Sequence, residues 1–382
     1  MKKAKPYLLR LLKVACLLLA ILVTVGILQE YVLCRNDQNR IRMRGYYLED
    51  KDSLDMVIIG ASDVYAGFSS ALAYKNFGYT SFPYATESAT AGSCKAQLKE
   101  VIRTQHPKLI VIEINGFLYT ERNENNEGHI RKFTDNIPLN TNKIDFINEN
   151  LATADQVEYY FPIIKYHGTW NDYPSGTTGL VTSVQQDIRG TSLLKGFRTV
   201  TTQFKPNKKV LNSQLATEEE RVDLTPLLEY KLRDLLDYCK SENITNVVFM
   251  RMPHLIYKKT YKRVKKANAA GDIIKSYGYD FYNFERGYEE VGIDPKTDFY
   301  NWDHLNIYGN EKFTNYLSKL LIDKYQLTGG GLTDKQKEDW DTAVEYYDKL
   351  YSFSDNAIKV TKKKKTLGEN YKTIKMLDEF QG

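Results

Sequence analysis

A short apolar run that ends in glycine, residues 55–60, begins a regular alternation of strand and helix signals. Two further apolar runs, 79–84 and 109–114, have the length and composition of buried strands. Between these runs, residues 70–77 can form a short helix, and residues 93–104 carry apolar side chains on one helical face. Strands that alternate with helices pair in parallel, with helices on both faces of the sheet. The predicted fold is therefore α/β, a three-layer α/β/α sandwich around a mainly parallel sheet.

The alternation resumes in the second half of the chain. The predicted elements there are a helix at 225–241, a strand at 247–250, a helix at 258–277, a strand at 279–284 and a closing helix at 308–324. Residues 117–222 interrupt the pattern, with only short helical signals near 143–152 and 154–161. A long insertion at the top of a parallel sheet usually shapes a binding site. We assign the α/β domain to residues 55–328, and the Lys-rich residues 329–382 to a solvated helix and loose end.

Residues 14–33 form an apolar segment close to the start of the chain. About twenty helical residues extend roughly 30 Å, enough to cross the apolar core of a bilayer. A cleaved signal peptide is the alternative, but no small-residue cleavage site follows the run, which favours an uncleaved anchor. The basic residues before the run place residues 1–13 in the cytoplasm and the main domain outside the cell membrane. Residues 34–54 are predicted to be a polar stalk beside the membrane.

Charge and motif content exclude several classes of function. The net charge of +5 equals the number of basic residues that precede the apolar run, so the rest of the chain is close to neutral. Nucleic acid is therefore not an expected partner. The four cysteines show no CxxC pair or Cys/His ligand spacing, and no P-loop, GxGxxG or HExxH motif occurs. We expect no metal site and no cofactor.

Ser62 follows the first predicted strand in the segment Gly60-Ala61-Ser62-Asp63. Ligands of open α/β folds bind at the carboxyl ends of parallel strands, and Gly60 permits a tight turn there. At the start of the following turn or helix, free backbone N–H groups suit an oxyanion. Ser62 is therefore a candidate nucleophile, unless it only caps a helix. Two roles are open for Asp63: its side chain either caps the following helix or contacts substrate.

A second candidate group lies shortly before the closing helix, in the segment 298–309. His304 stands there with Asp303 beside it and Asp298 six residues earlier. A His with acidic neighbours in a loop near the chain end has the composition of a general base and its orienting group. The alternative is a structural His that caps the helix or packs on Trp302.

Together the two segments resemble the SGNH/GDSL hydrolases, a family with four sequence blocks whose key residues are Ser, Gly, Asn and His. The resemblance implies a flavodoxin-like fold, with Ser62 as nucleophile and His304 as base. Asn115, at the end of the third predicted strand, stands where the family places its oxyanion Asn. The glycine of the second block has no counterpart after the second strand, and a backbone N–H near Glu87 or Ser88 would serve instead.

The segment 292–306, Gly-Ile-Asp-Pro-Lys-Thr-Asp-Phe-Tyr-Asn-Trp-Asp-His-Leu-Asn, carries a narrower resemblance. It is similar to membrane-anchored SGNH-like proteins of Gram-positive bacteria, which are distantly similar to proteins of teichoic-acid D-alanylation and alginate O-acetylation. The family's acid lies three residues before the catalytic His, and that position is Asn301 here. Either Asn301 orients the imidazole as a hydrogen-bond acceptor, or Asp303 or Asp298 replaces it.

Two further histidines are candidate substrate contacts. His254 follows the fourth predicted strand, so it belongs at the same sheet edge as Ser62. His167 lies in the insertion near Trp170, where an aromatic ring and a His would line a sugar-binding cleft. A packing role in a lid is the equal alternative for His167.

These residues and the resemblance predict acyl transfer through a covalent ester of Ser62, with water or a hydroxyl group as acceptor. The expected substrates are acyl donors and ester groups of cell-surface glycopolymers, and a membrane acyl-transfer protein is a candidate partner. The alternative, motivated by Asn301, is a non-catalytic accessory protein that binds a surface polymer or its assembly machinery. A phosphodiesterase or lipase also fits the fold, but the insertion lacks the long apolar stretch of a lipid lid.

Overall fold

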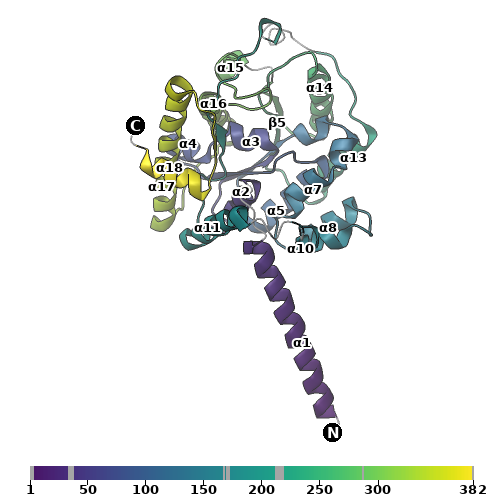
Figure 1. The fold of residues 1–382 in the computed structure, drawn as a ribbon. Helices are drawn as coiled ribbons and strands as arrows, with labels where there is room; N and C mark the ends of the chain where they lie inside the picture. The colour runs from purple at the N-terminus through teal and green to yellow at the C-terminus, as the bar shows by residue number, and fades with distance from the viewer. Residues whose placement is uncertain are drawn as a thin grey trace.

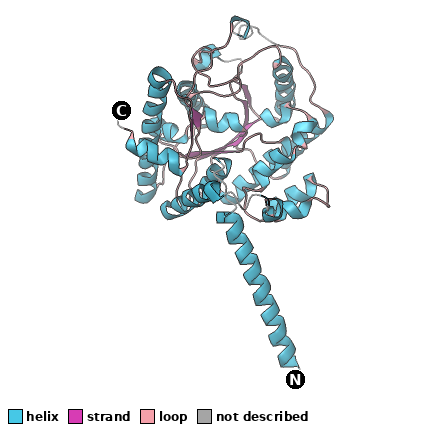
Figure 2. Ribbon diagram, in the orientation of Figure 1, coloured by secondary structure: helices cyan, strands magenta, loops and turns pink. Residues whose placement is uncertain are grey.

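A five-stranded parallel sheet forms the centre of the computed structural model, which describes residues 4–32, 38–166, 168, 173–210, 219–285 and 288–380 (Figures 1 and 2). The strands are β1 (Met56–Gly60), β2 (Ser81–Ala85), β3 (Leu109–Glu113), β5 (Val247–Arg251) and β6 (Phe281–Asn283). Their order is β2-β1-β3-β5-β6, and every neighbouring pair is parallel. The prediction of an α/β fold with a mainly parallel sheet is confirmed.

The strands form here because their apolar side chains are buried on both faces of the sheet, as in parallel sheets generally. Val57 and Ile59 of β1 belong to a hydrophobic cluster on one face, and Met56 and Ile58 to a second cluster on the other face. Alternate residues of a strand point to opposite faces. An unbroken apolar run therefore requires packing partners on both sides.

Helices supply those partners. The principal ones are α3 (Ser62–Gly67), α4 (Ser70–Phe77), α5 (Ala91–Thr104), α13 (Pro226–Ser241), α14 (Tyr261–Ser276) and α16 (Ile307–Tyr325). Leu98 of α5 and Leu228 of α13 pack into the first cluster. Phe313 and Leu317 of α16 pack into the second. The predicted helices agree with these elements to within a few residues at each end.

The segment between β3 and α13 is more helical than the sequence indicates. It contains η2 (Asn115–Leu118), α6 (Glu121–Glu124), α7 (Glu127–Thr134), α8 (Thr141–Asn150), α9 (Gln156–Tyr160), α10 (Pro162–Lys165) and α11 (Tyr173–Arg189), followed by β4 (Thr199–Val200). Phe133 and Phe146 pack edge to face, 5.3 Å between ring centres, within the first cluster. A few buried aromatic residues thus fix short helices whose polar sequences give little periodic signal.

The predicted stalk at 34–54 is wrong for the part that the structure describes. Residues 38–47 form α2 (Gln38–Tyr47), which buries Ile41, Met43 and Tyr46 in the domain. The Tyr46 ring lies 4.1 Å from the Tyr84 ring, measured between centroids. Three Arg residues and one Asn conceal this apolar face in the sequence; two of the four, Asn39 and Arg42, are themselves buried and hydrogen-bond to each other.

The predicted loose end at 329–382 is also corrected. Residues 334–356 form α17 (Asp334–Asn356), which packs on α4 and buries Trp340, Tyr347 and Leu350. The chain continues through η4 (Ala357–Thr361) and β7 (Thr366–Leu367), which pairs with β4, to α18 (Tyr371–Glu379). The apolar positions of α17 are widely spaced among charged residues, so the segment has the composition of a solvated helix. The charge run at 362–365 is exposed, as expected.

The N-terminal helix α1 (Ala4–Ile27), followed by η1 (Leu28–Val32), projects away from the domain (Figure 1). The stretch Tyr7–Tyr31 is long and apolar enough to cross a membrane. Its side chains are largely exposed. It is therefore not a core helix of the domain.

Candidate active site

Ser62 is the first residue of α3, directly beyond the carboxyl end of β1. The turn depends on Gly60, which has a φ of +153°. A Cβ atom on Gly60 would lie 2.8 Å from Cβ of Glu113 on β3 and 2.9 Å from Cγ2 of Val64. Only glycine fits this approach without displacement of its neighbours. Glycine thus lets the chain turn sharply and places Ser62 at the edge of the sheet.

His304 lies in a tight loop that precedes α16. Phe299 and Leu305 form an antiparallel bridge across the loop, and the N–H of Tyr300 donates to the carbonyl of His304 at 3.1 Å. The side-chain oxygen of Asn306 then caps α16 by accepting two backbone N–H groups of its first turn. The bridge and the cap together fix the backbone that carries the imidazole.

The structure brings Ser62 and His304 together although 242 residues separate them along the chain. Nε2 of His304 lies 2.7 Å from Oγ of Ser62, and Nδ1 lies 2.9 Å from Oδ1 of Asn301. The same Oδ1 accepts the N–H of Asp303 at 2.9 Å, which fixes the orientation of the amide. An amide oxygen only accepts, so Nδ1 carries the proton and Nε2 accepts from the serine hydroxyl. This is the tautomer that a general base needs.

The two carboxylates that could replace Asn301 do not hydrogen-bond to His304. Asp303 pairs with Arg263, with 2.9 Å between the charged groups. Asp298 is buried and pairs with Lys312 at 2.6 Å. Of the three candidate residues, Asn301 is therefore the one that hydrogen-bonds to the imidazole in this structure, through its amide oxygen.

Burial governs the protonation of His304. The pKa of His304 falls to about 4, chiefly because desolvation disfavours the imidazolium. The carboxylates of Asp63 and Asp303 oppose this shift without reversing it. The ring of Tyr300 stacks parallel to the imidazole, with 5.2 Å between centroids and a 4° interplanar angle. The base is therefore neutral at physiological pH and held in a fixed plane.

The structure also places the residues that the sequence suggests for an oxyanion site. Asn115 follows β3, the strand paired with β1, and is buried, with no hydrogen-bond partner for its Oδ1 among the described residues. Ser88 has a φ of +54°, in the left-handed region that favours glycine. The N–H of Glu87 is already donated to Asn39 at 2.9 Å. Of the two backbone groups suggested after β2, Ser88 is therefore the better candidate.

A buried ionic cluster lies beneath Ser62. Arg251, at the end of β5, lies 3.2 Å from Glu113, 2.8 Å from Glu285 and 3.7 Å from Asp63. Nε2 of His254 lies 3.0 Å from the same Asp63 carboxylate. Burial raises the pKa of Glu113 well above its usual range, and the neighbouring Asp63 carboxylate adds to the shift. A neutral Glu113 reduces the number of buried negative charges that face Arg251.

This cluster corrects the interpretations of Asp63 and His254. Both side chains are at most 3% exposed, so neither is an open substrate contact. The N-cap of α3 is Ala61, with no side-chain cap hydrogen bond. Oδ1 of Asp63 accepts the N–H of Val64 in the first turn of α3 at 3.2 Å, as a helix-capping role predicts, while Oδ2 faces His254 in the core. The sequence contains a weak signal for this arrangement, because a charged residue ends each of β3 and β5.

A further group near the site was not predicted from the sequence. Glu87 pairs with Arg198 and accepts from Tyr65, which lies one turn after Ser62 on α3. The guanidinium of Arg42 lies 3.6 Å from the centre of the Tyr65 ring. Arg198 contributes to the lowered pKa of His304, so this positive group lies near the base. Four separate segments of the chain form this group, and no local spacing reveals it.

His167 and Trp170 lie outside the described residues. Among the residues that the structure describes, no group of three or more His, Cys, Asp or Glu is arranged to hold a metal ion. A pocket of about 620 Å³ lies beside the end of α1, away from Ser62. Comparison with protein-family models, curated proteins and solved structures finds no match to this chain.

Proposed function

We propose that this chain is a membrane-anchored serine esterase or O-acyltransferase of the SGNH type. The observation that carries the proposal is the 2.7 Å contact between Oγ of Ser62 and Nε2 of His304, with Asn301 on the other ring nitrogen. A nucleophile, a base and a group that orients the base are the three parts of a serine hydrolase site. The helices on both sides of the sheet support the finer fold of this proposal, a flavodoxin-like three-layer sandwich.

The first half of the reaction acylates the serine. Nε2 of His304 takes the hydroxyl proton while Oγ of Ser62 bonds to the carbonyl carbon of an ester. The tetrahedral intermediate collapses, the bond to the leaving alkoxide breaks, and the imidazolium returns the proton to that oxygen. The products are an alcohol and an acyl ester of Ser62.

The second half transfers the acyl group. His304 takes a proton from water or from a sugar hydroxyl, whose oxygen attacks the ester of Ser62. Collapse breaks the bond between the acyl carbon and Oγ of Ser62, the imidazolium of His304 returns the proton to Oγ, and the acid or the new ester is released. The N–H of Ser62, the N–H of Ser88 and the side chain of Asn115 are the proposed donors to the oxyanion. Loss of one such donor typically costs about 100-fold or more in turnover.

The proposed substrates are ester groups of cell-envelope glycopolymers. An uncleaved α1, with its basic end in the cytoplasm, would hold the domain outside the membrane close to surface polymers. A membrane protein that delivers acyl groups is the proposed partner if a polymer hydroxyl is the acceptor. If water is the acceptor, the same site removes acyl groups.

A second candidate is an accessory protein that keeps the fold but binds polymer without turnover. The specific observation in its favour is Asn301, because an amide cannot neutralise the imidazolium as a carboxylate does. In this case Ser62 and His304 would be remnants of an active ancestor or contacts for a bound sugar.

Hydrolysis of p-nitrophenyl acetate by the purified chain tests the two candidates. We expect Ser62→Ala and His304→Ala each to remove the esterase activity while circular dichroism stays unchanged. Ser276→Ala and His106→Ala are matched controls, because both residues lie on the exposed surface far from the site along the fold. Equal rates in all five proteins would reject the esterase and favour the accessory protein.

A further inference from the structure

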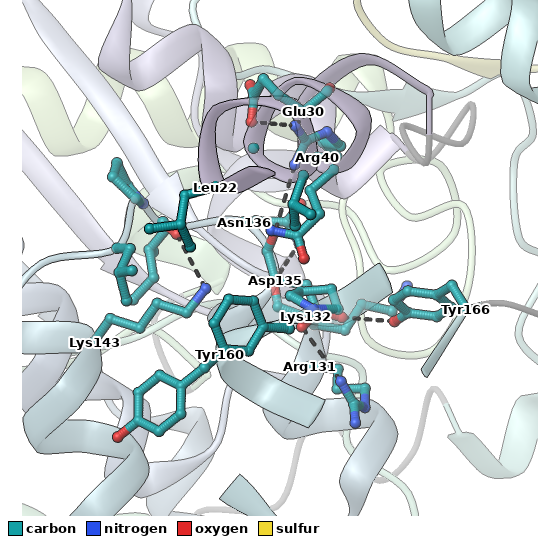
Figure 3. A pocket seen from close by; sticks show the side chains of 18 of the residues that line it. Leu22, Glu30, Arg40, Arg131, Lys132, Asp135, Asn136, Lys143, Tyr160 and Tyr166 are labelled. Carbon is teal, nitrogen blue, oxygen red and sulfur yellow. Dashed lines mark hydrogen bonds and ion pairs between the residues drawn. The ribbon is translucent and has the colours of Figure 1, made fainter. Parts of the chain in front are cut away.

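A pocket of about 620 Å³ lies where α1 meets the domain (Figure 3). Leu22, Val25 and Glu30 form the wall contributed by α1 and η1. The opposite wall comes from α2, α7, α8 and the loop at 135–139. This volume lies in the range typical of small-ligand sites.

The wall formed by the domain is rich in basic groups. The charged side chains that line the pocket are Arg40, Arg131, Lys132 and Lys143 on the basic side and Glu30 and Asp135 on the acidic side. Arg40 pairs with Glu30 at 2.7 Å, and Arg131 lies 3.5 Å from Asp135. Lys143 stands apart from these pairs, and its amine points into the pocket (Figure 3).

Lys143 is a buried amine that the Asp135 and Glu30 carboxylates stabilise through space, without an ion pair to either given among the described residues. The residue is 5% exposed, and the closest acceptor given for its Nζ among the described residues is the carbonyl of Ile137, at 3.5 Å. Desolvation lowers the pKa of Lys143 to about 8. A buried ammonium with one long hydrogen bond is costly unless an anion accompanies it. An anionic group in the pocket would supply the missing acceptors.

The wall formed by α1 changes from polar to apolar along its length. Glu30 stands at the domain end, and Leu22 lies eight residues below it, about 12 Å along a helix. Both belong to the stretch Tyr7–Tyr31 that is able to cross a membrane. With this stretch across a bilayer, the pocket would extend from the level of the lipid headgroups to the level of the first acyl methylenes.

The surface around the pocket has the character of a membrane-facing surface. Most of the exposed large hydrophobic side chains beyond α1 lie in the insertion, among them Leu139, Ile144, Ile164, Leu180, Val184 and Ile188. The last three lie on α11, which is joined to η1 by a hydrogen bond from Tyr31 to Asp187 at 2.9 Å. Figure 1 shows α8, α10 and α11 around the upper end of α1. Exposed apolar groups gathered at this position suit contact with a bilayer.

We propose that this pocket binds an anionic phospholipid from the surrounding bilayer. The phosphate lies against Lys143 and the guanidinium of Arg40, and the first methylenes of an acyl chain lie along Leu22 and Val25. The charge of the basic wall and the apolar wall of α1 together select a lipid over a soluble anion. The site is separate from Ser62, so it does not depend on catalysis.

Native mass spectrometry of the full chain, exchanged from detergent with defined lipids, tests this proposal. We expect retention of phosphatidylglycerol to exceed that of phosphatidylcholine by about fivefold or more, the effect of one basic group near a lipid surface. Lys143→Met should remove that preference. Lys95→Met is the matched control, because its amine pairs with Asp234 away from the pocket.

A second variant keeps the test decisive if Lys143→Met fails to fold. A Cβ atom on Gly26 meets nothing within 4 Å, and Gly26 lines the pocket, so Gly26→Phe should fill it without a clash. Retention of phosphatidylglycerol should fall in Gly26→Phe and stay unchanged in Ala20→Phe. Equal retention of both lipids in the native chain would overturn the proposal. So would displacement of phosphatidylglycerol by inorganic phosphate at equal concentration, which would indicate a site for soluble anions.

Discussion

His304 receives its orientation from an amide and its electrostatic support from more distant carboxylates. Asn301 fixes the ring through Nδ1 but contributes no negative charge. Asp63 and Asp303 act on the imidazolium through space. Proton transfer from Ser62 therefore creates a positive charge that no direct contact neutralises. The chemistry at this residue should be slower than with a carboxylate at position 301, and its pH dependence should be unusual.

The pH profile of the native chain follows from the lowered pKa of His304. A general base acts in its neutral form, and the pKa of His304 lies at about 4. We expect kcat/KM for p-nitrophenyl acetate to be flat above about pH 5 and to fall only as the pH approaches 4. An acid limb near 6.5, the ordinary value for His, would contradict the buried environment described here.

The substitution Asn301→Asp should raise the pKa of His304, because a carboxylate in hydrogen-bond contact stabilises the imidazolium. We expect the acid limb of kcat/KM to move up by about one pH unit or more, with a higher plateau. Asp303→Asn is the comparison variant, because it removes a carboxylate that raises the pKa of His304 through space, so its acid limb should move down instead. Identical profiles for Asn301→Asp and the native chain would show that position 301 does not govern the base.

Ser62, His304 and Asn301 could be predicted from the sequence because each stands at a recognisable distance from a strand end or a motif. The contacts of Asp63 and His254 could not be predicted, because they depend on Arg251 at the end of another strand. A local pattern tells which edge of the sheet a residue occupies. It does not tell whether a charged side chain turns outward or into the core.

At the scale of elements, the parallel strands were predictable because burial on both faces requires long apolar runs. The stalk and the C-terminal segment were not, because α2 and α17 bury only a few large side chains among many charged ones. Such helices gain stability from tertiary contacts rather than from periodicity. The short helices of the insertion between β3 and α13 are likewise stabilised by tertiary contacts rather than by a periodic apolar pattern.

Removal of α2 should destabilise the whole domain. A chain that begins at residue 38 keeps Ile41, Met43 and Tyr46 in place, whereas a chain that begins at residue 49 exposes the surface they cover. Burial of three large apolar side chains contributes on the order of 5 kcal/mol. We expect the first chain to unfold cooperatively in urea and the second to lose at least half of its free energy of unfolding. Equal midpoints would show that α2 is dispensable.

The ionic cluster that joins α3, β3 and β5 gives another prediction. Arg251→Met leaves Asp63 and Glu285 buried without their main positive partner. Breaking a buried pair in this way costs about 3–5 kcal/mol. Arg233→Met, which removes an exposed pair with Glu229, should change the free energy of unfolding by less than about 0.5 kcal/mol. Chemical denaturation measures both, and similar losses would contradict the buried role of Arg251.

At the scale of the whole molecule, one chain carries three features in a fixed arrangement. They are α1, the apolar surface around its end and the candidate site at Ser62. The apolar N-terminal segment ends with η1 at Val32, and α2 begins at Gln38; Arg42 of α2 stacks on Tyr65, one turn beyond Ser62. The element that follows the apolar segment in the described part of the chain therefore lies close to the candidate site. This order suits an enzyme whose substrate is held at the membrane surface.

Covalent labelling of Ser62 tests the central claim most directly. The full chain would be treated with an activated alkyl phosphonate, and the modified residue identified by peptide mass spectrometry. We predict a single adduct on Ser62, formed about 100-fold more slowly in His304→Ala and absent in Ser62→Ala. A folded chain that forms no adduct on Ser62, or forms it equally fast without His304, would contradict the serine–histidine site.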